Sequence, residues 1–157
     1  MKSRKISLLT LLVLSILLPA NLAGAQGKTN VSGTWKMNAE KSKFERGGPK
    51  NITIKFDQQG PSLREVFTIT RDDGSERAMN LTYTLDGKES SQQLEGQEIK
   101  TTAKWEGEAL VIEFKNEKGF NFIRKFTVSG DGKTMTIDVN QTNSNGSATD
   151  KVILDKQ

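Results

Sequence analysis

The sequence predicts an all-β domain in which an antiparallel meander closes into a β-barrel of about 8–10 strands. After residue 50, apolar side chains alternate with polar ones at the two-residue period of a strand. Glycine-containing turn sequences recur among them at roughly ten-residue spacing, with no helical period between the turns. Such a sheet tends to close on itself because closure removes exposed edge strands.

The N-terminus has the features of an export signal. Three cations lie within the first five residues, an apolar run follows over residues 6–18, and Ala23-Gly24-Ala25 gives the small-x-small pattern of a cleavage site. The run is shorter than the roughly 20 residues that a membrane-spanning helix needs. We therefore expect residues 1–25 to be a signal peptide and residues 26–157 to form one domain, exported to the periplasm or the extracellular medium.

Composition limits the functions that remain. Without the three signal cations, 20 Lys and Arg stand against 19 Asp and Glu, so we expect no nucleic-acid partner. The chain has neither histidine nor cysteine, which excludes Ser-His-Asp triads, thiol nucleophiles and the usual zinc or copper sites. We expect no cofactor, no metal and no catalytic residues; an enzyme would require carboxylates that converge with perturbed pKa values.

The first predicted strand covers residues 31–37 and places Gly33 and Trp35 on its apolar face. The glycine leaves room for another group to pass close to the backbone, and the tryptophan is expected to fill one end of the core. Residues 38–44 then predict one short helical turn, with Asn38 as its N-cap.

The remaining strands follow from the same alternation. They are expected over residues 52–56, 63–70, 79–85, 99–105, 110–114, 120–128, 135–139 and 152–154. An outer-membrane barrel would share this alternation. The outer face of this chain would lack the aromatic girdles of such barrels, so we expect a protein that is not embedded in a membrane.

Strand 120–128 contains the sharpest chemical signal in the sequence. Its apolar face carries three phenylalanines and a valine, with Arg124 in their midst. A cation in that position needs an anion, a carbonyl group or an aromatic ring as its partner. Glu65 falls on the apolar face of strand 63–70, which makes it a candidate partner.

The first strand also carries a family resemblance. The run Ser32-Gly33-Thr34-Trp35-Lys36, with Asn38-Ala39-Glu40-Lys41-Ser42 after it, resembles small bacterial lipocalin-like exported proteins of unassigned function. More widely it is similar to the lipocalins and the calycin group, which includes the fatty-acid-binding proteins. The resemblance implies a lipocalin-like β-barrel with a ligand inside.

The chain also departs from these families. It has no Thr-Asp-Tyr signature between its middle strands, and it lacks the helical lid of intracellular fatty-acid-binding proteins. In lipocalins an arginine close after the final barrel strand packs on the first-strand tryptophan, whereas Arg124 is followed by two more predicted strands.

Two functions remain open. In the first, the barrel binds a small apolar or amphipathic ligand, and Arg124 anchors an anionic head group such as a fatty-acid carboxylate. The apolar lining would then consist of Phe122, Phe126, Phe67, Tyr83, Phe114 and Ile137.

In the second, the protein is a structural or interaction module of the cell envelope with a filled core. Arg124 would then pair with Glu65 or stack on Trp35 or Trp105. The volume of any internal cavity distinguishes the two functions.

Overall fold

The computed structural model describes residues 29–94 and 96–157, so the expected export signal and its cleavage site lie outside the described residues. The described part of the chain forms ten antiparallel strands and contains no helix, so no helix in it could cross a bilayer. The strands are β1 (Gly33–Met37), β2 (Asn51–Gln59), β3 (Ser62–Thr70), β4 (Glu76–Thr84), β5 (Ser90–Leu94), β6 (Gln97–Glu106), β7 (Ala109–Lys115), β8 (Asn121–Val128), β9 (Thr134–Asn143) and β10 (Gly146–Lys156).

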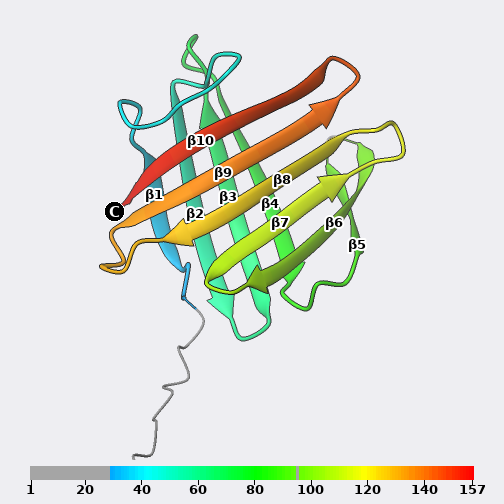
Figure 1. Cartoon of the computed structure of the whole chain (residues 1–157), viewed down its shortest axis with the longest axis horizontal. Coiled ribbons are helices and arrows are strands. Elements are labelled where there is room, and N and C mark those ends of the chain that lie inside the picture. Colours follow the sequence, from blue (N-terminus) through cyan, green and yellow to red (C-terminus); the bar gives the residue numbers. More distant parts are fainter. Residues whose placement is uncertain (1–28, 95) are drawn as a thin grey trace, which may run out of the picture.

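The ten strands form one sheet in the order β4-β3-β2-β1-β10-β9-β8-β7-β6-β5. Consecutive strands are neighbours, apart from β4 and β5, and the first strand, β1, also pairs with the last, β10. Strands β7 to β10 lie in front of β2 to β4 and cross them steeply, as two layers around a common interior (Figure 1). This confirms the predicted all-β meander.

The barrel is nearly closed. β4 and β5 are the two ends of the sheet, and across this seam β4 approaches β6. The Gly87 N–H donates to the Ala103 carbonyl there (3.0 Å), which ties the β4–β5 connection to β6. The seam is therefore bridged locally, without the continuous ladder that joins the other neighbours.

Alternation places the apolar side chains inside, as the sequence predicts. On β2, for example, Ile52, Ile54 and Phe56 are buried, and the residues between them are more exposed. The largest completely buried side chains come from strands on both layers and meet in the middle. They include Trp35, Phe56, Leu63, Leu110, Ile112, Phe126, Met135 and Leu154.

Strand β5 was not expected from the sequence. Its residues Ser-Ser-Gln-Gln-Leu include a single apolar side chain, so the two-residue pattern is absent. The strand is held instead by its ladder to β6 and by polar contacts: Gln92 Nε2 donates to Thr101 Oγ1 (3.1 Å). A polar strand at the end of a sheet leaves no hydrophobic signal.

The single helical turn predicted at residues 38–44 is present only as one hydrogen-bonded turn at its start, and no helix forms. Asn38 does accept a cap-like bond from the Lys41 N–H (3.2 Å), and the Ser42 N–H bonds the Asn38 carbonyl (3.1 Å). The chain then leaves the turn, because Lys43 exchanges two backbone bonds with Lys151 on β10 (2.7 and 2.9 Å). Pairing with β10 thus outcompetes a second helical turn.

Gly33 gives the close approach that its position in β1 predicts. Its φ of 130° favours glycine, and a Cβ there would lie 2.9 Å from the Cε atom of Lys156. The Lys156 ammonium lies 5.1 Å from the centroid of the Trp35 ring. A cation near the end of the last strand therefore does pack on the first-strand tryptophan.

Replacing Trp35 with alanine should lower the free energy of unfolding by about 3–5 kcal/mol. The side chain is completely buried, and its indole N–H donates to the Val31 carbonyl (2.8 Å). Urea denaturation measures the loss. Trp105→Ala is the matched control and should cost less, because Trp105 is only partly buried and packs against the edge of the core. Equal losses would contradict a central role for Trp35.

Candidate functional site

Arg124 and Glu65 form a buried ion pair that crosses the barrel interior from β8 to β3. Nη1 of Arg124 donates to Oε1 of Glu65 (2.6 Å), and Nη2 donates to Oε2 (2.7 Å). The exposed fraction is 3% for Arg124 and 0% for Glu65. Both carboxylate oxygens are therefore engaged, and the pairing expected from the sequence is present.

Tyr83 on β4 completes this cluster. Its hydroxyl donates to Oε2 of Glu65 (2.7 Å) and accepts a bond from Nη2 of Arg124 (3.2 Å). Three aromatic rings surround the guanidinium, with Cζ at 5.0–5.4 Å from their centroids. These rings belong to Phe67, Phe114 and Phe126, so the predicted stacking on Trp35 or Trp105 does not occur.

The cluster fixes its protonation states. Burial and the neighbouring Glu65 charge raise the pKa of Tyr83 well above its ordinary value, so the hydroxyl stays protonated. Burial by itself would lower the pKa of Arg124, but the Glu65 charge and the hydrogen bonds more than offset it and raise that pKa. The guanidinium is therefore charged at every ordinary pH.

Strand register divides the interior into levels. Arg124 pairs in register with Ile112 on β7 and Val139 on β9, and these positions form the level of the ion pair. One inward position further along β8, Phe126 lies opposite Leu110 and Ile137, where the core is solid. In the other direction the interior is hollow.

This hollow is a cavity of about 170 Å³. It lies toward the end of the barrel that carries the β3–β4, β7–β8 and β9–β10 turns. Its lining is apolar except for Arg124 at the floor and Gln141 nearer the mouth. The lining residues are Phe67, Met79, Leu81, Leu94, Phe114, Phe120, Phe122, Arg124 and Gln141.

The residues predicted to line a ligand cavity fall into two groups. Arg124, Phe67, Phe114 and Phe122 do line it. Phe126, Ile137 and Tyr83 point inward as predicted, but they lie on the solid side of the ion pair and are not part of the lining.

The sequence reasoning did not place Met79, Leu81, Leu94, Phe120 and Gln141 in the lining. The alternation signal identifies inward faces, and it did so for Met79, Leu81 and Phe120. Gln141 lies opposite Phe122 in the β8–β9 ladder, which only the register reveals. Leu94 belongs to the polar strand that gave no signal.

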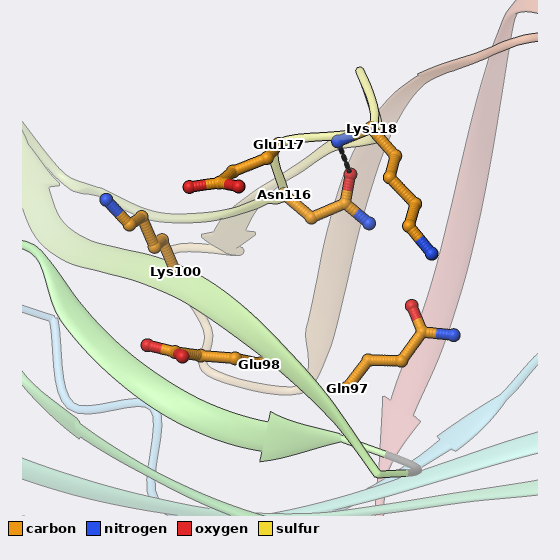
Figure 2. Close-up of a pocket in the computed structure, with 6 residues that line it drawn as sticks. All are labelled: Gln97, Glu98, Lys100, Asn116, Glu117 and Lys118. Carbon is orange, nitrogen blue, oxygen red and sulfur yellow. Dashed lines mark hydrogen bonds between the residues drawn. The ribbon is translucent and has the colours of Figure 1, made fainter.

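A second depression is larger but of a different kind. It encloses about 370 Å³ between the start of β6 and the β7–β8 turn (Figure 2). Its lining is polar and mostly exposed: Gln97, Glu98, Lys100, Asn116, Glu117 and Lys118. Water competes for every polar group there, so this depression offers no burial for an apolar molecule.

Substituting Glu65 with leucine should cost about 3–5 kcal/mol in the free energy of unfolding, because it leaves the Arg124 charge buried without its partner. The double variant Glu65→Leu/Arg124→Met, which replaces the pair with apolar side chains, should recover most of that loss. Urea denaturation of wild type and both variants measures the two values. A double variant as unstable as the single one would contradict the assignment of the cost to the unpaired charge.

Tyr83 should not ionise while the protein is folded. The chain contains one tyrosine, so the ultraviolet absorbance of phenolate reports on Tyr83 alone. Its raised pKa means that the unfolded state loses this proton first, near pH 10, and that stability falls as the pH rises beyond that value. Phenolate absorbance should therefore appear only together with loss of the native circular dichroism. A phenolate signal from folded protein would disprove the buried hydrogen bond to Glu65.

Comparison by sequence identifies no relative: no family model and no curated protein matches the chain. Comparison of structures finds many similar folds. A secretory abundant heat soluble protein from Ramazzottius varieornatus has a TM-score of 0.64 at 17% identity, covering 83% of this chain and 98% of its own.

Two further structures contain ligands according to their descriptions. A Schistosoma mansoni fatty acid binding protein in complex with arachidonic acid has a TM-score of 0.56 at 14% identity, covering 83% of this chain and 98% of its own. Zebrafish ileal bile acid-binding protein complexed with cholic acid has a TM-score of 0.52 at 17% identity, covering 80% and 98%. At these identities the similarity concerns the fold, so the resemblance to the calycin group holds at the level of the β-barrel.

Proposed function

We propose that this protein binds a small hydrophobic ligand inside its barrel, in the cavity above the Arg124–Glu65 pair. The cavity itself carries the proposal: a hollow of about 170 Å³ lined by aromatic and aliphatic side chains, with two polar groups among them. The fold neighbours support it, since two of them are described as complexes with arachidonic acid and with cholic acid. Both of these neighbours are named as binding proteins, which agrees with a non-catalytic role.

The cavity volume sets the size of the ligand. An apolar protein cavity of roughly 150 Å³ takes up benzene, whereas drug-sized ligands occupy roughly 300–1,000 Å³. The cavity here is close to the smaller value. The buried part of the ligand is therefore a single ring or a short chain, and any longer part would extend past Phe120 at the mouth.

The expected export signal suggests the compartment in which the protein binds its ligand. If residues 1–25 are removed on export, the barrel meets its ligand in the periplasm or outside the cell. The alternative of a structural module with a filled core fits the solid half of the interior, around Phe126 and Leu110. The cavity on the other side of Arg124 favours ligand binding.

Met79→Trp should weaken ligand binding by filling the cavity. Met79 lines the cavity from β4, while its neighbour Ala78 is exposed on the same strand. Acetophenone, a neutral ring-sized probe, is titrated into wild type, Met79→Trp and Ala78→Trp, and amide chemical shifts are followed by NMR. We expect saturable shifts at cavity residues in wild type and Ala78→Trp, and an affinity at least roughly ten-fold weaker in Met79→Trp. Equal binding by both variants would place the ligand elsewhere.

A further inference from the structure

We infer that Gln141 is the residue that recognises the polar group of the ligand, an inference that rests on the proposed function. Its side-chain amide binds a neutral carbonyl or hydroxyl group toward the mouth of the cavity, while the apolar end of the ligand lies against the floor. The opposite arrangement would place the polar group of the ligand at Arg124.

The polar groups at the floor are already engaged with one another. Both carboxylate oxygens of Glu65 accept hydrogen bonds from Arg124, and the Tyr83 hydroxyl donates and accepts within the same cluster. Nε of Arg124 has no partner, but it is too deeply buried for a ligand to contact it. Phe67 and Phe114 line the cavity and also contact the guanidinium. The floor therefore favours the apolar end of a ligand.

Gln141 is the other polar residue of the lining, and its situation is different. It lies on the inward face of β9 and is half-buried. Within the part of the chain that the structure describes, its side-chain amide makes no hydrogen bond, and neither amide atom is among the fully buried ones. The amide is therefore open to water and to a ligand in the cavity.

The neighbours of Gln141 explain why its amide has no partner in the sheet. In register it lies opposite Phe122 on β8 and Ala148 on β10, and neither side chain can form a hydrogen bond. The Phe122 ring stacks on Phe120, with 6.2 Å between the ring centroids. A hydrogen bond between a ligand and Gln141 would thus form beside apolar groups, where it is stronger than in open water.

The spacing between the floor and Gln141 suits one ring. Gln141 is one inward position beyond Val139, which lies opposite Arg124, and such positions are separated by roughly 6.5–7 Å. On the other wall, Leu81 lies opposite Glu65 and lines the cavity at the level of the floor. A substituted ring can therefore contact Leu81 with its apolar edge while its substituent reaches the amide of Gln141.

The chemistry of the amide sets the class of ligand. The side-chain N–H of Gln141 can donate to a carbonyl oxygen, and its oxygen can accept from a hydroxyl group. A ligand that fills the cavity to this height displaces the water that solvates the amide, and a ligand without a polar group leaves the amide unpaired. Because the amide carries no charge, it favours a neutral partner.

Two probes of the same shape test this recognition: acetophenone and α-methylstyrene, which differ only in a carbonyl oxygen against a methylene group. Both are titrated at neutral pH into wild type, Gln141→Leu and Gln93→Leu, and amide chemical shifts are followed by NMR. The affinity for acetophenone relative to α-methylstyrene should fall roughly ten-fold in Gln141→Leu, because the carbonyl loses its donor. Comparing the two probes within each protein cancels changes in cavity shape that affect both.

Gln93→Leu is the matched control, since it makes the same chemical change at an exposed position of β5. This variant should keep the wild-type ratio of affinities. A ratio that is equally unchanged in Gln141→Leu would overturn the inference.

The orientation of the ligand is tested in the wild-type protein, without any substitution. Nuclear Overhauser effects should connect the para proton of acetophenone with the methyl groups of Leu81, and the acetyl methyl group with the side-chain amide of Gln141. Effects between the acetyl methyl group and the Leu81 methyl groups would place the carbonyl at the floor and would contradict the inference.

Failure of this inference can be told apart from failure of the proposed function. If neither probe shifts the amides of cavity residues in the wild type, the ligand-binding function is wrong. If both probes bind in the cavity but the ratio of affinities does not depend on Gln141, the barrel binds ligands and recognition by Gln141 is disproved.

Discussion

The ion pair between Arg124 and Glu65 is the contact on which the interior of this barrel depends. It joins β8 in one layer to β3 in the other, and both its members are almost completely buried. Burying either charge alone would cost too much free energy. Each residue can therefore be buried only together with the other and with the Tyr83 hydroxyl that binds Glu65. The side chains packed on either side keep the two charges buried and in contact with each other.

The pair separates two kinds of interior. On one side, aromatic and aliphatic chains such as Phe126 and Leu110 fill the space completely. On the other side, the rings of Phe67 and Phe114 form the walls of the cavity while still contacting the guanidinium. The same aromatic faces therefore stabilise the cation and give the cavity its apolar character. Because Glu65 neutralises Arg124, the floor of the cavity carries no net charge.

Much of the fold could be predicted from the sequence, and the limits of that prediction have physical causes. Alternation identifies the inward face of each strand, which is why Glu65 and Arg124 could be paired before the structure was known. Alternation carries no information on height along the barrel, so Phe126 could not be told apart from Phe122 as a cavity residue. Strand β5 was missed because its side chains are polar. The turn at residues 38–44 ends early because Lys43 pairs with β10, a long-range contact that the local sequence does not reveal.

The pairing of β1 with β10 links the completion of the barrel to the order in which the chain emerges. Each of the ten strands can form a hairpin with a sequence neighbour as it appears, but the second edge of β1 stays open until the last strand is available. Local hairpins form readily, whereas a ladder between the two ends of a chain forms late. During synthesis, the open edge of β1 is therefore available for pairing with a wrong strand. The arrival of β10 ends that exposure and brings Lys156 onto Trp35.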